Sequence, residues 1–301
     1  MTSFAMMPVS AKRITISHVT DYRYSEAVHL NEHRLLLRPR EGRQVKLISH
    51  SVKVTPEAEL FFAEDVFGND VAIATLSKKA RSLRVEATTE VELSAVPWPV
   101  YRIDLPATRY PFEYTDFEKA ALDTHISSDS VSDSLTRWAR SFLNGQSVDT
   151  LTLLQAINSG IHNQVTYEAR DAEGTQSAEE TLALGLGSCR DFAVLFTKAA
   201  AALGFGTRLV SGYLVPEDLG LLGSGEGGTT HAWGEIYLPG AGWVAFDPTN
   251  EQMGHYGLIA VAVGHDMGAL SPVTGSYGGR NPAEANLSIS ITMRLKGSSE
   301  A

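Results

Sequence analysis

The sequence has 301 residues, 43% of them hydrophobic, so it can bury a substantial core and is long enough for two domains. It carries 25 Lys and Arg against 35 Asp and Glu, and the formal charge of −10 argues against nucleic acids and anionic membranes as partners. A single cysteine excludes an intramolecular disulfide, and neither a signal peptide nor a stretch long enough to span a bilayer is recognisable. We therefore expect a soluble cytoplasmic protein.

The first hundred residues show the alternation and β-branched content of strands. Gly68 and Asn69, between two apolar runs, tolerate positive φ and predict a hairpin turn. We expect residues 1–100 to form an antiparallel β-sandwich domain. Its histidines are too dispersed for a metal site and fit surface or sheet-face positions: His18, His29, His33 and His50.

A change of composition follows between Val96 and Tyr114, where the chain has four prolines and five aromatic residues. Because proline disfavours both helices and central strands, we interpret residues 101–115 as a linker that packs against a domain through its aromatic side chains. Helical patterns come next, with apolar stripes that indicate buried faces. These stripes are Leu135, Trp138, Ala139 and Phe142, and then Leu151, Leu154, Ile157 and Ile161.

The pattern returns to strands after Gly204 and stays so to the end of the chain. We therefore expect residues 116–301 to form a second domain in which helices precede an antiparallel sheet, an α+β arrangement. The strand segments are TRLVSGYLV, HAWGEIYLP, GWVAFDP, LIAVAV and ANLSISITMRL.

The only cysteine, Cys189, lies at a predicted helix start. Ser188 is a good N-cap, and Asp191, three residues later, completes a capping pattern. A thiol at this position is close to unpaired backbone N–H groups and to the positive end of the helix dipole, which favour the thiolate. Cys189 is therefore a candidate nucleophile, although a lone cysteine on an apolar helix face is often only a small core residue.

Two further residues complete a catalytic set. A cysteine nucleophile needs a histidine that transfers the proton to the leaving group and a polar group that orients the imidazole. His231 opens one strand and Asp247 ends the next, with the turn PGAG between them. Taken singly, each fits an ordinary loop or turn role. Their joint occurrence with Cys189 predicts a Cys-His-Asp triad.

The triad sets a condition on the hairpin that carries His231 and Asp247. Residues paired across an antiparallel hairpin have a constant sum of residue numbers, and a one-residue shift moves a side chain to the opposite face. A loop of two or four residues centred on Gly240 and Ala241 would place the two side chains on opposite faces. The sequence therefore predicts an odd-length loop or a β-bulge here.

Five segments of the chain resemble the transglutaminase-like superfamily of papain-like cysteine enzymes, in its bacterial form with an extra N-terminal β domain. They are YRYSEAVHLNEHRLLLRPR, GSCRDFAVLF, LGFGTRLVSGYL, HAWGEIYLPGAGWVAFDPTN and VAVGHDMGALSPVTGSYGG. The resemblance implies a β sandwich followed by a papain-like α+β core, and by its pattern Cys189 is the nucleophile, His231 the general base and acid, and Asp247 the orienting carboxylate. His265 departs from the arginine of related sequences.

The expected activity is acyl transfer through a thioester on a peptide or carboxamide bond of a protein or peptide substrate, with no cofactor and no metal. We favour hydrolysis, as in a cysteine peptidase or amidase, over amine transfer by a cross-linking transglutaminase. The backbone N–H of Cys189 is a natural oxyanion donor. Candidates for a second donor are Asn163, Gln164 and the Trp233 indole.

Two hypotheses from other classes of function stay open. In one, the chain is a binding module for a protein or peptide and the core is only a scaffold. In the other, Cys189 binds a metal together with histidines such as His255 and His265, although the sequence has no closely spaced ligand pair.

Overall fold

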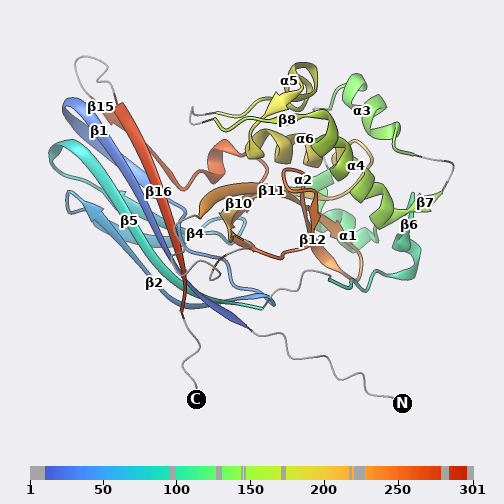
Figure 1. Cartoon of the computed structure of the whole chain (residues 1–301), viewed down its shortest axis with the longest axis horizontal. Coiled ribbons are helices and arrows are strands. Elements are labelled where there is room, and N and C mark those ends of the chain that lie inside the picture. Colours follow the sequence, from blue (N-terminus) through green and yellow to red (C-terminus); the bar gives the residue numbers. More distant parts are fainter. Residues whose placement is uncertain are drawn as a thin grey trace.

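The structure is a computed structural model that describes residues 11–94, 99–126, 131–143, 145, 147–170, 174–216, 219, 228–278 and 285–296. Figure 1 shows two parts: a curled sheet built from both ends of the chain, and a part in which helices cover a smaller sheet. Among the described residues, no helix is long and apolar enough to cross a membrane.

The curled sheet has seven strands in the order β2-β5-β1-β4-β3, with β15 and β16 also paired to β1. Its central strand β1 changes register against β5 between Arg23 and Val28, a β-bulge that lets such a long strand bend. The antiparallel β structure predicted for this region is confirmed. The strands are β1 (Lys12–Leu35), β2 (Val45–Thr55), β3 (Glu59–Glu64), β4 (Asp70–Thr75), β5 (Lys79–Leu93), β15 (Val273–Gly278) and β16 (Ala285–Leu295).

The last two strands belong to a different part of the molecule from the one that the sequence predicted. We expected residues 116–301 to form the second domain, but β15 and β16 pair with β1 of the curled sheet. The pairing of β1 with β16 runs from Ile14 with Leu295 to Tyr24 with Ala285, so it is continuous over eleven residues of β1. The alternation of side chains identifies a strand but not its partner strand. The backbone N–H and C=O groups of β1 need hydrogen-bond partners, and β15 and β16 supply them.

The predicted turn at Gly68 and Asn69 is confirmed, and it joins the two parts of the molecule. Glu64 pairs with Asp70 across the turn, and Gly68 has a φ of +68°. Asn69 is fully buried; its side chain donates to the carbonyl of Val263 at 2.8 Å and accepts from the N–H of Val263 at 2.9 Å. This pair of bonds fixes the curled sheet against strand β14 (Leu258–Gly264) of the second part.

The expected linker contains short regular elements, η1 (Leu105–Thr108) and β6 (Arg109–Tyr110), and β6 pairs with β7 (Val148–Asp149). Its aromatic side chains Tyr101, Tyr110 and Phe112 pack against the core of the second part, as predicted. Residues 95–98 at the start of the proline-rich segment lie outside the described residues.

The second part has a five-stranded sheet in the order β13-β12-β11-β10-β14. A short parallel pair, β8 (Thr166–Tyr167) with β9 (Leu186–Gly187), leads into the central helix. The sheet strands are β10 (Thr207–Leu214), β11 (Thr229–Leu238), β12 (Gly242–Asp247), β13 (Gln252–Met253) and β14. The helices are α1 (Asp116–Ala121), α2 (Asp123–Ile126), α3 (Asp133–Arg140), α4 (Thr150–Gln164), α5 (Ala178–Leu184), α6 (Cys189–Ala201) and the 3₁₀ turn η2 (Gly268–Leu270).

Helix α6 is the centre of this part because it packs on β10 and β11 and against α3, α4 and α5. Phe192, Leu195, Phe196 and Ala199 are fully buried and form the apolar face that the spacing predicts. Each large apolar side chain buried in this way contributes about 1.5–3 kcal/mol. The resulting core holds the first residue of α6 rigidly with respect to the sheet.

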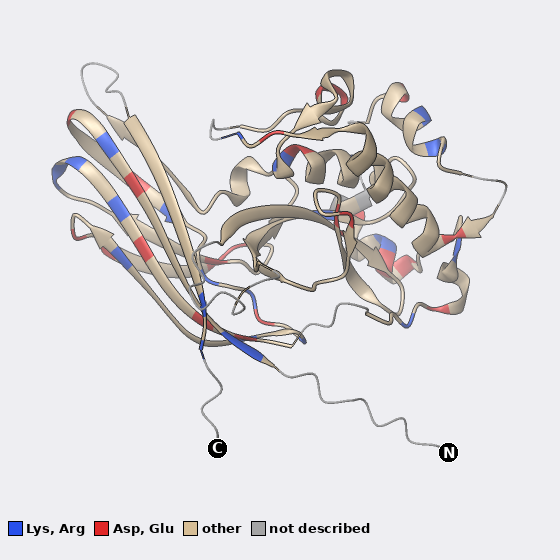
Figure 2. Ribbon diagram, viewed as in Figure 1, with Lys and Arg blue, Asp and Glu red and all other residues tan. Residues whose placement is uncertain are grey.

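The charged side chains are mixed in sign over the described surface. Figure 2 shows Lys and Arg interspersed with Asp and Glu along the strands of the curled sheet. Such alternation gives no broad field of one sign.

Candidate active site

Cys189 is the first residue of α6, as predicted, and its side chain is half-buried. The carboxylate of Asp191 accepts from both the backbone N–H and the hydroxyl of Ser188, each at 2.8 Å. The other Asp191 oxygen accepts from Arg170 at 2.8 Å and from the N–H of Gln176 at 2.7 Å. Asp191 therefore fixes the turn that presents the thiol.

The residue before this turn must be small. A Cβ added at Gly187 would lie 2.9 Å from the Cβ of Asp191. Because the Asp191 carboxylate is fully buried and engaged, it cannot move away without losing its partners.

The hairpin of β11 and β12 has the register that the triad requires. Leu238 pairs with Gly242, which leaves a three-residue loop, and Gly234 pairs with Phe246. The odd-length loop puts His231 and Asp247 on the same face, and the register prediction is confirmed. Nε2 of His231 lies 2.7 Å from Oδ2 of Asp247.

Asp247 is fully buried and held on both oxygens. Oδ1 accepts from the N–H of Thr249 at 3.0 Å, and Oδ2 accepts from the side-chain amide of Asn250 at 2.7 Å in addition to His231. The Asn250 amide nitrogen also lies 3.5 Å from Nε2 of His231. The sequence predicted a role for Asp247 in this Asp-Pro-Thr-Asn segment but none for Asn250; the turn is what brings the Asn250 amide back onto the carboxylate.

His231 contacts both the thiol and the carboxylate. Burial by itself lowers the pKa of His231, but its hydrogen bonds to Asp247 and to Cys189, and the charges of both groups, outweigh burial and raise its pKa to about 10. The imidazole is thus protonated at neutral pH. Because Nε2 faces Asp247, the ring presents Nδ1 to the thiol.

Two tryptophans lie in the same hairpin. Trp233 is fully buried in an apolar cluster, and its ring centroid is 6.2 Å from that of His231 at an interplanar angle of 27°. Trp243 is half-buried and lies beneath the guanidinium of Arg208, 4.2 Å from its ring centroid. Trp233 thus supports the imidazole from the core.

One exposed aromatic residue lies beside the nucleophile. Tyr167 pairs in register with Gly187, two residues before Cys189, and its side chain is 52% exposed. Its ring is 6.3 Å from that of Phe192. Partial burial and the nearby Cys189 raise the pKa of Tyr167, which Arg190 lowers in part. Sequence reasoning missed this residue, because nothing in its local pattern relates it to Cys189.

The other candidates of the sequence analysis have different surroundings. Gln164 accepts a hydrogen bond from the Trp138 indole, and Asn163 donates to Ser159 within α4. The buried Trp233 indole N–H has no partner among the described residues. His255 binds Glu235 at 3.2 Å.

A metal site does not emerge from the described part of the chain, where no group of three or more His, Cys, Asp or Glu side chains is placed to hold an ion. His265, the second histidine considered, packs against the rings of Phe67 and His125. His265 also lines a cavity beside α6.

A model of the bacterial transglutaminase-like N-terminal region matches residues 14–92, and the model of the transglutaminase-like superfamily matches residues 136–248. The chain belongs to the transglutaminase-like superfamily. The family expected from the sequence is thereby confirmed, and the second matched span contains Cys189, His231 and Asp247.

Several proteins are similar to this transglutaminase-like chain over most of its length. An uncharacterized protein of Mycobacterium tuberculosis is 26% identical over 89% of both chains, and one of Mycobacterium leprae is 26% identical over 93% of this chain and 98% of its own. The crystal structure of a candidate cysteine protease from Cytophaga hutchinsonii superposes with a TM-score of 0.70 and 20% identity, covering 94% of this chain and 91% of that chain. The chain therefore shares the fold of that structure.

Proposed function

We propose that the protein is a thiol-dependent acyl-transfer enzyme that cleaves a peptide or carboxamide bond through a Cys189-His231-Asp247 triad. The observation that carries the proposal is the position of His231, which binds Asp247 at 2.7 Å and hydrogen-bonds to Cys189. This arrangement provides a nucleophile, a proton carrier and a group that orients the carrier.

The first half-reaction forms the acyl-enzyme. The Cys189 thiolate attacks the carbonyl carbon, and the backbone N–H of Cys189 donates to the developing oxyanion. The protonated imidazole of His231 then gives its proton to the nitrogen of the scissile bond as the C–N bond breaks. The amine or ammonia departs and leaves a thioester on Cys189.

The second half-reaction regenerates the enzyme. His231, now neutral, takes a proton from water as the oxygen attacks the thioester carbon, and the C–S bond breaks to release the carboxylic acid and the thiolate. Asp247 keeps the imidazole in place and stabilises its positive charge throughout. With an amine in place of water, the same steps would produce a cross-linked amide.

We favour water as the acceptor. An amine must compete with water, which is present at far higher concentration, and that competition needs a channel that excludes water. No feature of the sequence identifies such a channel. A protein or peptide is the substrate class that the chemistry of the triad supports.

The test combines labelling with turnover. Iodoacetamide at neutral pH should alkylate Cys189 faster than it alkylates a free thiol. A peptide-library screen, in which new amino termini report peptide cleavage and ammonia reports carboxamide cleavage, should show turnover that Cys189→Ala abolishes without loss of fold. Inertness of Cys189 would instead favour a non-catalytic binding module. Incorporation of an added amine faster than hydrolysis would identify a transglutaminase.

A further inference from the structure

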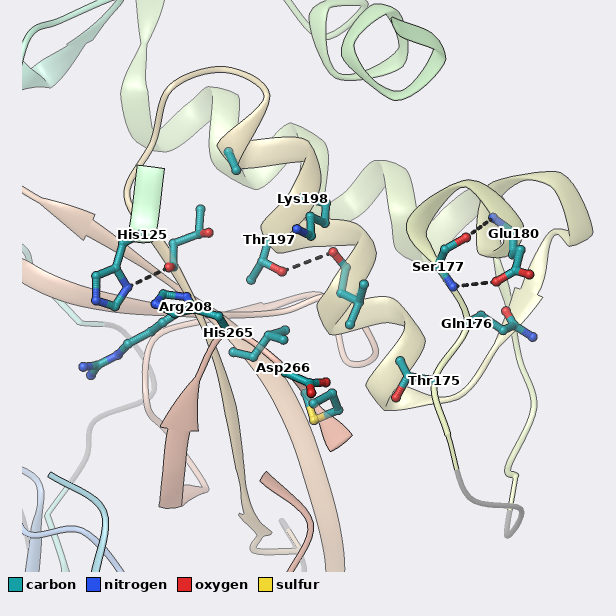
Figure 3. A pocket seen from close by; sticks show the side chains of 15 residues that line it. His125, Thr175, Gln176, Ser177, Glu180, Thr197, Lys198, Arg208, His265 and Asp266 are labelled. Carbon is teal, nitrogen blue, oxygen red and sulfur yellow. Dashed lines mark hydrogen bonds between the residues drawn. The ribbon is translucent and has the colours of Figure 1, made fainter. Parts of the chain in front are cut away.

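A cavity of about 580 Å³ lies along α6 and includes none of the triad residues in its lining. Figure 3 shows it between α6, the residues that lead into α5, and the turn after β14. Its volume is in the range of small-molecule sites. Leu209 and Met267 line the cavity and belong to the buried apolar cluster against which Cys189 packs, so this cluster lies between the cavity and the triad cysteine.

Basic side chains gather at this cavity, which His125, Lys198, Arg208 and His265 line. The rings of His125 and His265 are 4.3 Å apart in a T-shaped arrangement. Burial is the largest cause that lowers the pKa of each imidazole; Arg208 lowers that of His125 further, and His125 and Lys198 lower that of His265. Once protonated, the two imidazoles therefore repel each other and the nearby cations.

Two carboxylates also line the cavity, and each accepts a hydrogen bond from a backbone N–H. Glu180 accepts from the N–H of Ser177 at 2.7 Å, in the capping box of α5. Asp266 accepts from the N–H of Gly268 at 3.0 Å at the exposed edge of the cavity.

The basic residues Arg208 and Lys198 have acidic neighbours outside the cavity lining. Arg208 is paired with Glu235 at 2.6 Å, and Lys198 lies within electrostatic range of Glu179, whose pKa is lowered chiefly by a hydrogen bond to Ser132. Among the described residues, neither His125 nor His265 has a carboxylate partner.

The orientation of His125 determines what it can offer a ligand. Its Nδ1 lies 3.1 Å from the carbonyl oxygen of Thr207, so Nδ1 carries a hydrogen and donates it there (Figure 3). Nε2 is then a lone pair in the neutral ring and an N–H donor in the protonated ring. His125 can donate to an anion only after it takes up a proton.

We propose that this cavity binds a small oxyanion, held by Lys198 together with the His125 and His265 pair, and that binding is coupled to protonation of the imidazoles. Phosphate-type and carboxylate anions share the chemistry required, since both accept several charge-assisted hydrogen bonds. Burial lowers the pKa of both imidazoles, so the site gains cationic donors as the pH falls.

The experiment is a titration of the Cys189→Ala protein with sulfate, which stays fully ionised, and in a parallel arm with acetate, at constant ionic strength. NMR signals of the imidazoles report the site. We expect the signals of His125 and His265 to shift, and affinity at about pH 5.5 to exceed that at about pH 7.5 by roughly tenfold or more, because the bound state holds more protons. The arm that binds more tightly identifies the anion class.

Variants make the assignment specific. His265→Ala should reduce sulfate affinity at the lower pH by about tenfold, the value of one charge-assisted hydrogen bond. Lys119→Met removes an exposed lysine of α1 and should leave affinity unchanged. Absence of shifts at His125 and His265 at both pH values, or shifts confined to His231, would overturn the proposal.

Discussion

Asp191 accepts two hydrogen bonds of 2.8 Å from Ser188, one from its backbone N–H and one from its hydroxyl. Because Ser188 directly precedes Cys189, the orientation of the thiol depends on a carboxylate that is itself buried and paired with Arg170 at 2.8 Å. The capping residue and the nucleophile thus form one rigid unit.

Asp191→Asn should destabilise the protein and slow the reaction of Cys189. The amide has one acceptor oxygen for four donors and leaves Arg170 without its charge partner, so we expect a loss of about 2–4 kcal/mol in the free energy of unfolding. We also expect roughly tenfold slower alkylation, since small displacements of a nucleophile are costly. Urea unfolding and iodoacetamide kinetics measure the two effects. Asp116→Asn, at an exposed helix start, is the control; equal behaviour of both variants would contradict the role of Asp191.

The free energy of unfolding should decrease at alkaline pH because of His231. The pKa of His231 is raised from 6.5 to about 10, so the stabilisation of its charged form is complete below pH 6.5 and is lost as the pH rises through about 10. The free energy of unfolding should therefore decrease over this range in the wild-type protein. In Asp247→Asn the pKa of His231 should be lower and the decrease should occur at lower pH. Urea titrations across the range measure it, and parallel curves for the two proteins would count against the ion pair.

Gly212 pairs in register with His231, and the space around it is fully occupied. A Cβ at this position would lie 2.1 Å from the carbonyl oxygen of Ile259 and 2.9 Å from the Trp233 ring. Gly212→Ala should therefore cost about 1–3 kcal/mol or more, because the backbone of β14 and the Trp233 ring of β11 must move, and it should slow alkylation of Cys189. Gly42→Ala is the matched control, since nothing lies within 4 Å of its added Cβ. Thermal unfolding and iodoacetamide kinetics of the two variants test this, and equal losses would show that β14 and Trp233 accommodate the added methyl group.

Tyr167 should affect the choice of substrate more than the reactivity of the thiol. Its exposed ring beside Cys189 offers an apolar surface to a ligand side chain. Tyr167→Ala should slow labelling by an aromatic peptidyl haloketone by about tenfold, the value of one aromatic contact, and should barely change labelling by iodoacetamide. Tyr167→Phe should keep both rates. A parallel loss with the two reagents would instead assign Tyr167 a role in the triad itself.

The sequence was most informative where function depends on local order. The S-x-x-D pattern placed Cys189 at the first position of α6. The parity of the residue numbers required an odd-length loop or a β-bulge between the strands of His231 and Asp247. Both follow from helix and strand periodicity, which are properties of the chain itself.

Sequence patterns could not reveal contacts between distant segments. The amide of Asn250 on Asp247, the Arg170 partner of Asp191 and the exposed ring of Tyr167 depend on how turns and strands meet in space. The return of β15 and β16 to β1 belongs to the same class, because strand pairing satisfies backbone groups without regard to side-chain pattern.

The sequence by itself determined the α+β class, the family, and the identity of the three residues of the proposed triad. Only the tertiary structure decided which groups surround them and how the cavity beside α6 is charged. The reason is physical: periodicity and capping act over a few residues, whereas hydrogen-bond partners, burial and pKa values are set by groups that only folding brings together.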